Sequence, residues 1–463
     1  MNAPLKPAVI LLSLALGACS LDPAYTRPDA PIPASYAVAG DGETAIRPDS
    51  WQAYFTDPEL QRLIQAALDH NRDLRIAALR VEEARAQYGI QRADRLPAVD
   101  ATAAYERSRA LYTPDQTINT DLYRVGLGIS GFELDFFGRV KSLSSAALES
   151  YLATQEAQQS ARASLIAEVA IAYVNVRALA ERIRLAGETE ASRTQGYQRT
   201  QRRQQTGLDN ALDLKAAELQ LESAKASLAA LRREQAQAVN ALQLLTGQPG
   251  QPILDQDIAL DRMAFAPLPA GLPSALLENR PDIRAAEHRL KAANANIGAA
   301  RAAFFPRIQL TTNIGLADGH LSGLFSGGHA KVWAFSPQLT LPIFNHGRNR
   351  ANLDLASVRR EIGVAEYERA IQTAFTEVSD VLASREQIEA QITAQMRITD
   401  SEKERLNLTN RRFDKGIANY LEVLDAQRSL FDAEQQLVQL KQLSLSNSTT
   451  LFKVLGGEWQ PQS

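Results

Sequence analysis

The residues with the clearest chemical character lie in one short segment near the C-terminal end of the sequence. Glu422 and Asp425 are three positions apart, so on a helix their carboxylates share one face, about 6 Å apart. At an effective dielectric near 20, two such charges repel each other by roughly 3 kcal/mol. Bound cations or the guanidinium of Arg428 would relieve this repulsion. The spacing is typical of either a solvated coiled-coil face or a charged constriction that selects cations.

The other reactive residue types form no catalytic or metal-binding pattern. Gly126-x-Gly128-x-x-Gly131 matches a dinucleotide motif by letter, but it lies in a strand-like stretch with no helix after it to bind phosphate. The histidines, at 70, 288, 320, 329 and 346, lack the spacing of metal ligands, and His320 and His329 fall in a predicted extracellular loop. No nucleophile, base and acid occur as a set, and a net charge of −3 gives no reason to expect nucleic acid. We expect no enzymatic activity, no cofactor and no metal site.

The only cysteine, Cys19, ends a targeting segment. Residues 1–18 carry one charge and a short apolar run, which is too short to span a bilayer and is typical of a signal peptide. The sequence Leu16-Gly17-Ala18-Cys19 resembles a bacterial lipobox, in which the cysteine becomes the lipidated first residue. Ser20 follows instead of the aspartate that retains lipoproteins in the inner membrane, so the resemblance implies an anchor in outer-membrane lipid. The alternative is an ordinary cleaved signal with a chance cysteine.

The elements that position these residues occur twice. Asp73-Leu74-Arg75 returns as Asp282-Ile283-Arg284, and 282 − 73 = 209. Pro97, Gly138, Gly207 and Gly247 return at the same offset, as Pro306, Gly347, Gly416 and Gly456. A constant offset predicts two copies of one structural unit, and its length is far above that of solenoid repeats.

Each copy contains two stretches of alternating apolar and polar residues. They cover about 98–107 and 122–134 in the first copy, and about 306–317 and 331–343 in the second. Period 2, a length near ten residues and aromatic residues toward the ends are typical of membrane-spanning β-strands. We therefore expect four such strands per chain.

The remainder of each copy is predicted to be a long helical hairpin. Residues 141–248 and 343–460 contain no proline, and a glycine interrupts each run, at Gly207 and Gly416. The returning helices carry apolar residues at steps of three and four, from Leu214 and from Val423, with polar interruptions at Gln235 and Ser444. This pattern predicts coiled-coil seams.

Four membrane strands cannot close a barrel alone, because an open sheet edge in lipid leaves backbone groups unsatisfied at several kcal/mol each. Two chains would give about eight strands and a barrel filled by side chains, whereas three chains would give about twelve and a wider lumen. Glycines 126, 128 and 315 on the predicted inward face favour an open lumen. A homotrimer is the oligomer that these residues favour, and the resemblance described next supports the same number.

Several motifs carry a family resemblance across the mature chain. They are the lipobox at Cys19, Trp51-x3-Phe55-x-Asp57-x2-Leu60, Asn71-x-Asp73-Leu74, Phe137-Gly138-Arg139, and the run from Tyr420 to Arg428. With the repeat, they resemble the TolC-like outer-membrane factor family, specifically the lipoprotein branch that serves RND-type tripartite efflux pumps. The resemblance implies a mainly α fold in a trimer, with a 12-stranded transmembrane β-barrel that continues into a long periplasmic α-helical barrel and a mixed equatorial region.

On this basis the chain divides into six segments. Residues 1–18 are the signal peptide, 19–57 a lipidated extended segment, 58–250 and 274–457 the two structural repeats, 251–273 an equatorial linker, and 458–463 a tail.

The resemblance also implies roles for residues near the hairpin turns. Leu421, Glu422, Asp425 and Arg428 match the closed periplasmic aperture. The first copy has Asp213 at the Glu422 position but Ala216 at the Asp425 position, so we expect the second hairpin to form the gate. The turn residues are expected to contact a periplasmic adaptor; they are Thr206, Gly207, Leu208, Lys415, Gly416 and Ile417.

The predicted function is a passive exit channel in the outer membrane of a Gram-negative bacterium. An inner-membrane RND-type pump and a periplasmic adaptor would deliver drugs or other small toxic molecules to it. Two alternatives remain: a duct for type I protein secretion, which would use the same fold, and a periplasmic coiled-coil adaptor or structural lipoprotein, against which the four strands count.

Overall fold

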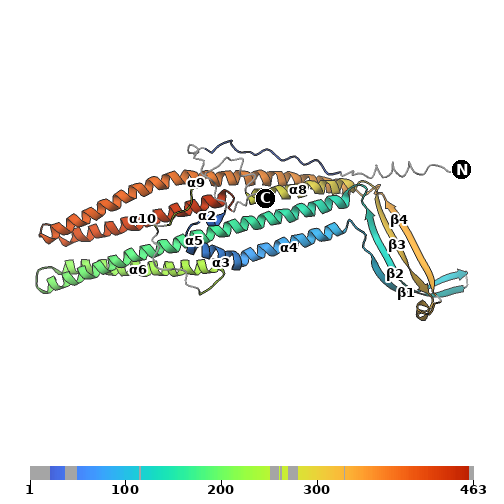
Figure 1. Cartoon of the computed structure of the whole chain (residues 1–463), viewed down its shortest axis with the longest axis horizontal. Coiled ribbons are helices and arrows are strands. Elements are labelled where there is room, and N and C mark those ends of the chain that lie inside the picture. The colour runs from blue at the N-terminus through green and yellow to red at the C-terminus, as the bar shows by residue number, and fades with distance from the viewer. Residues whose placement is uncertain are drawn as a thin grey trace. The chain divides into compact units, whose positions relative to one another are not determined.

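The computed structural model describes residues 21–36, 50–113, 116–250, 260, 263–268, 280–327 and 329–457. The predicted signal peptide, Cys19, the C-terminal tail and most of the predicted linker lie outside the described residues. The described chain is mainly helical with one four-stranded sheet, which confirms the predicted secondary-structure content (Figure 1).

The chain forms two compact units, and each unit draws on both sequence repeats. Unit 1 comprises Met1–Asp29, Leu79–Glu156 and Arg284–Arg369, and unit 2 comprises Ala30–Ala78, Ala157–Ile283 and Ala370–Ser463. Four of the five unit boundaries fall within helices: α4 (Arg72–Ala93), α5 (Arg139–Gln205), α8 (Pro281–Ala302) and α9 (Arg348–Asp414).

Unit 1 contains an antiparallel sheet of order β1-β2-β3-β4. Its strands are β1 (Asp100–Thr113), β2 (Gln116–Leu134), β3 (Arg307–Asp318) and β4 (Ala330–Thr340). The first two are longer than predicted, because pairing continues through the polar residues to Thr113↔Gln116, where a wide loop was expected. A short 3₁₀ helix, η3 (Leu321–Leu324), lies between β3 and β4.

Two glycines allow β2 and β3 to approach closely at the centre of the sheet. Gly126 pairs with Gly315, and a Cβ at these positions would lie 2.5 Å from Ile314 O and 2.3 Å from Val125 O. No side chain fits at such distances, so the close contact between the two backbones requires glycine on both strands. In the sequence these glycines favoured an open lumen, and the close contact between the two backbones is a second reason for them.

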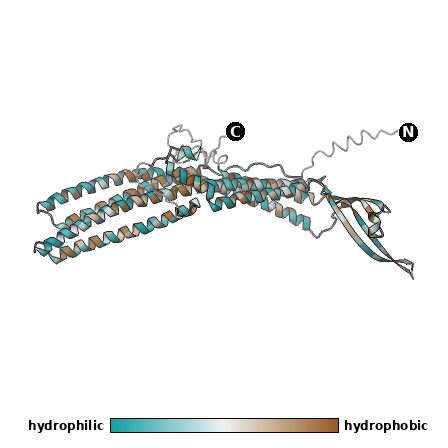
Figure 2. Ribbon diagram, turned by 60° about the horizontal axis from the view of Figure 1, so that its bottom comes forward, coloured by the Kyte–Doolittle hydropathy of each residue, from teal (hydrophilic) through white to brown (hydrophobic). Residues whose placement is uncertain are grey.

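Unit 2 contains the ends of the helical hairpins and a dense aromatic core. Helices α6 (Ala211–Thr246) and α10 (Tyr420–Val454) return from the long helices α5 and α9, each 67 residues long and so about 100 Å if straight. Apolar and polar residues alternate along the long helices (Figure 2), as expected for helices that bury one stripe. An apolar window in α5 has the composition of a membrane helix, but 67% of that window is buried inside the protein, so we assign it to the core.

The aromatic core joins the N-terminal and C-terminal parts of the chain. Tyr54, in the short helix α2 (Trp51–Tyr54), stacks on Phe452 of α10, with ring centroids 5.1 Å apart. Phe265 from the linker packs against Phe55 at 5.1 Å and bridges to it along the backbone. Tyr54, Phe55 and Phe452 are almost completely buried. Helix α3 (Pro58–His70) follows, capped by Asp57.

Candidate functional site: the ends of the helical hairpins

Both hairpins reverse direction through the same glycine-centred turn. Gly207 and Gly416 have φ angles of 75° and 72°, in the left-handed region that favours glycine. The turn hydrogen bonds repeat at the offset of 209: Leu208 N donates to Arg203 O and Ile417 N donates to Arg412 O, both at 2.9 Å. The duplication therefore extends to individual hydrogen bonds.

Each returning helix begins with an asparagine cap. The side chain of Asn210 accepts from Asp213 N at 2.8 Å, and that of Asn419 accepts from Glu422 N at 3.0 Å. Glu422 also accepts a hydrogen bond from Asn419 N, which completes a capping box. Glu422 thus stabilises the first turn of α10 in addition to carrying charge.

Asp425 lies between two arginines. It contacts Arg428 at 2.6 Å on its own helix and Arg405 of α9 at 3.3 Å. Arg405 also contacts Glu402 at 2.6 Å, and hydrogen bonds to Glu402 and Asp425 raise the pKa of Arg405. The result is a chain of alternating charges that crosses from α9 to α10.

Glu422 also contacts an arginine, but at a longer distance than Asp425 does. Its carboxylate lies 3.6 Å from Arg412 of α9. The side chains of Glu422 and Asp425 are 44% and 47% exposed, so each single ion pair contributes only about 0.2–1 kcal/mol. Within one chain, the two predicted aperture carboxylates are therefore paired with arginines but remain accessible to water.

Helix α10 is fixed on two sides by polar contacts. On the α9 side, Gln395 donates to Ala433 O at 3.0 Å. On the α5 side, Arg182 donates to the side chain of Gln435 at 2.7 Å, and Gln435 donates back to Arg182 O at 3.1 Å. Ser444, the predicted polar interruption, is half-buried. The buried polar residues of α10 are Gln435 and Thr449, and Gln435 faces α5, a contact that a two-helix seam does not include.

Close to the turn, α10 contacts α5 through a tyrosine and a glycine. A Cβ at Gly196 of α5 would lie 2.1 Å from the hydroxyl oxygen of Tyr420. Burial raises the pKa of Tyr420, and its ring packs against Phe413 of α9 with centroids 5.4 Å apart. Gly196 therefore provides the space that Tyr420 occupies between the two hairpins.

The first hairpin carries a different charge pattern. Arg203, the repeat counterpart of Arg412, pairs with Asp209 in the turn at 3.0 Å. Asp213 accepts no ion pair within the described residues, and Ala216 replaces the aspartate found at 425. The charged chain across the helices is thus a feature of the second hairpin.

The predicted tip residues lie at the exposed ends of the hairpins. Thr206 donates to Arg203 O at 2.9 Å, and Lys415 is exposed. Leu208 and Ile417 are repeat counterparts, 68% and 65% exposed. Leu421 is also exposed, as is its counterpart Leu212. Each tip therefore presents a pair of apolar side chains to solvent.

Sequence reasoning missed Leu212, Arg405 and Arg412. Leu212 could have been found by applying the offset of 209 to Leu421. The two arginines could have been found by counting outward from the Gly416 turn, because residues at similar distances on either side of a hairpin turn face each other across it.

Within the part of the chain that the structure describes, no group of three or more histidine, cysteine, aspartate or glutamate side chains could hold a metal ion. His288 of α8 pairs with Glu149 of α5 at 2.6 Å, within unit 1. The side chains described at the hairpin ends offer charged and apolar surfaces.

The sequence matches the family model described as "Outer membrane efflux protein" twice, over residues 63–248 and 272–457. The two matches are displaced by 272 − 63 = 209 residues, the same offset that relates the repeats and the turns.

Similar proteins extend over nearly the whole chain. The probable efflux pump outer membrane protein TtgC of Pseudomonas putida is 44% identical over 98% of this chain and 96% of its own length. The cation efflux system protein CusC of Escherichia coli is 42% identical over 99% of this chain and 100% of its own length. The open state of the Neisseria gonorrhoeae MtrE outer membrane channel has a TM-score of 0.87 at 40% identity, covering 95% of this chain and 99% of that structure. The chain belongs to the outer membrane efflux protein family.

Proposed function

We propose that three copies of this outer-membrane efflux channel join their sheets into one barrel, whose lumen continues between the helical hairpins. The observation that carries the proposal is the sheet order, because β1 and β4 each pair with one neighbour within the described residues. Sheet edges in lipid leave backbone groups unsatisfied, so edges of sister chains must pair. Three chains of four strands give a barrel of twelve strands with an open lumen.

In this assembly the second hairpin forms the aperture. Threefold symmetry would repeat Glu422 and Asp425 as two rings of carboxylates, with Leu421 and Arg428 beside them. The contact between Asp425 and Arg405 holds α10 against α9, which supports a closed resting arrangement. Opening would require this exposed pair to separate, at a modest cost in free energy.

The hairpin tips are the proposed contact with a periplasmic adaptor, which would connect the channel to an inner-membrane RND-type pump. The exposed pairs Leu208 with Leu212 and Ile417 with Leu421 support this role, since exposed apolar clusters mark interaction sites. The chain itself would supply neither energy nor catalysis. The cargo would be drugs or other small toxic molecules selected by the pump.

Lipidation at Cys19 is the proposed anchor. The segment that follows is fixed to α8: Arg27 contacts Glu287 at 2.7 Å, and Asn294 donates to Pro23 O at 2.8 Å. Bonds from Arg27 and Lys291 lower the pKa of Glu287, although burial alone would raise it. These contacts would hold an acylated N-terminus beside the helix that leads into β3.

The test is electrophoresis of outer-membrane fractions with and without heating, followed by planar-bilayer recording of the purified protein. We expect a heat-dissociable trimer that conducts ions and is blocked by divalent cations at the aperture. A monomer in unheated samples, or a trimer that conducts nothing under any condition, would contradict the proposal.

A further inference from the structure

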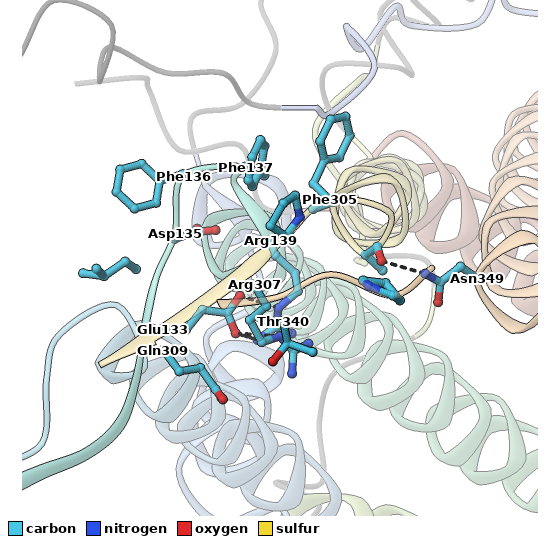
Figure 3. A pocket seen from close by; sticks show the side chains of 15 residues that line it. Glu133, Asp135, Phe136, Phe137, Arg139, Phe305, Arg307, Gln309, Thr340 and Asn349 are labelled. Atoms are coloured by element: carbon cyan, nitrogen blue, oxygen red, sulfur yellow. Dashed lines mark hydrogen bonds and ion pairs between the residues drawn. The ribbon is translucent and has the colours of Figure 1, made fainter. Parts of the chain in front are cut away.

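A polar cavity of about 310 Å³ lies in unit 1 where the strands meet the helices. It is lined by the C-terminal ends of β2 and β4, the start of β3, and the adjoining ends of α5 and α8 (Figure 3). Its charged side chains are Glu133, Asp135, Arg139 and Arg307. The inference rests on the proposed barrel: with the strands across the outer membrane, this cavity lies at the level of the membrane interface on the helical side.

Glu133 is the centre of the charged cluster. It accepts two hydrogen bonds from Arg139, at 2.8 and 2.7 Å, and lies 3.2 Å from Nε of Arg307. The bond to Glu133 raises the pKa of Arg139. Arg307 makes its contact through Nε alone, is 47% exposed, and has no acceptor for its two Nη groups within the described part of the chain. Arg307 can therefore donate to an anion in the cavity.

Asp135 supplies the opposite charge on the cavity wall. Its carboxylate accepts from Lys141 N at 2.7 Å, which caps the start of α5. One carboxylate oxygen serves this cap, so the other can accept from a cationic group. The four side chains sum to zero charge, which suits a ligand that carries both signs.

The sequence repeat shows that the turn itself does not require this cluster. The offset of 209 places Pro342 opposite Glu133 and Phe344 opposite Asp135, while Arg139 corresponds to Arg348. The second copy makes the same strand-to-helix passage, with a left-handed glycine at 347 as at 138, without either carboxylate. A purely local structural role would apply equally to both copies.

The cavity has an apolar rim. Phe136 and Phe305, which line it, are 45% and 41% exposed. Leu341, Ile343 and Phe344 follow the end of β4 and are 47%, 92% and 79% exposed. Aromatic and aliphatic side chains at this level normally contact acyl chains and headgroups.

We propose that this cavity binds the headgroup of a zwitterionic phospholipid, with the phosphate at Arg307 and the ammonium at Asp135. The apolar rim would contact the acyl chains, which distinguishes a lipid from a free phosphate compound. Each protomer would hold one lipid at the point where its sheet passes into α5.

Native mass spectrometry of the full-length trimer, titrated with phosphatidylethanolamine or phosphatidylglycerol, tests the proposal. We expect about one tightly held phosphatidylethanolamine per protomer and a loss of roughly tenfold in affinity for Arg307→Gln, which removes a charge-assisted contact. Asp135→Asn keeps the helix cap and should abolish the preference for phosphatidylethanolamine over phosphatidylglycerol. Arg109→Gln, at the far end of β1, is the control and should bind as the wild type does.

Three outcomes would overturn the proposal. Arg307→Gln could retain the lipid as well as Arg109→Gln does, which would indicate unspecific lipid around the barrel. Phosphoethanolamine or inorganic phosphate could displace the lipid at equal concentration, which would indicate a site for a soluble anion. A trimer without any retained lipid would indicate that a neighbouring subunit covers the cavity.

Discussion

At the scale of single residues, Asp425 holds the second hairpin through contacts on both helices. Replacing Asp425 with alanine removes the contacts to Arg405 and Arg428. The pair with Arg405, which joins the two helices, contributes about 0.2–1 kcal/mol, so the closed aperture should lose up to roughly fivefold in population. We expect Asp425→Ala to raise the mean conductance in planar bilayers and to weaken block by divalent cations. The double variant Glu422→Ala/Asp425→Ala should extend both effects.

Asp213→Ala is the matched control for this prediction. Asp213 occupies the Glu422 position of the first copy and makes no ion pair within the described residues. Its removal should change conductance far less than removal of Asp425. Equal conductance in Asp425→Ala and the wild type would remove the aperture assignment.

Gly196 and Tyr420 allow a second test at the residue scale, by a double-mutant cycle. Alanine at 196 places a Cβ 2.1 Å from the Tyr420 hydroxyl oxygen but 3.4 Å from Cζ. Gly196→Ala should therefore displace α10 from α5 and lower the temperature at which the trimer dissociates. In a Tyr420→Phe background the clashing oxygen is absent, so the same substitution should be nearly neutral. Equal effects in both backgrounds would show that Gly196 serves another purpose.

At the scale of elements, substitutions of the turn glycines can test adaptor docking without preventing the channel from folding. A Cβ at Gly416 would meet nothing within 4 Å, so a side chain there costs only left-handed backbone strain of about 1–2 kcal/mol. We expect Gly416→Trp, and likewise Gly207→Trp, to abolish drug resistance in a strain that depends on this channel, while trimer levels in the outer membrane stay the same.

Gly347 provides the control for strain. It has a φ of 81° and equally open surroundings, but it lies at the other end of α9. Gly347→Trp should keep more resistance than Gly416→Trp. Resistance that survives substitution at both tips would rule out a docking role for the turns.

The elements also show what sequence reasoning can and cannot reach. Periodicity and the offset of 209 predicted the four strands and the glycine turns, because alternation and proline-free runs are local properties. The contacts of Gln435 with Arg182 and of Asp425 with Arg405 were not predictable from local pattern. They depend on which helix faces α10, and a third helix, α5, takes part in that packing. The length of β1 was underestimated because β1 and β2 remain paired through the polar residues near the end of β1.

At the scale of the whole molecule, the number of chains around the lumen determines whether the barrel is narrow and filled or wide and open. Two chains would give a barrel of eight strands filled by side chains, and three would give twelve strands with an open lumen. Gly126 and Gly315 are paired on the neighbouring strands β2 and β3, so the centre of the sheet carries no side chains there. This supports the wider barrel of twelve strands. The count can be measured without any assumption about the gate.

Subunit mixing gives that measurement. Wild-type chains and chains with an acidic C-terminal tag are expressed together, and unheated outer-membrane complexes are separated by charge on a gel. A closed ring of three subunits gives four bands, in proportions of about 1:3:3:1 when both chains are equally abundant. A pair of subunits would give three bands, and a monomer two. Within the described residues β1 and β4 are the edges of the sheet, and pairing β1 of each chain with β4 of the next closes a ring of three, so we expect the four-band pattern.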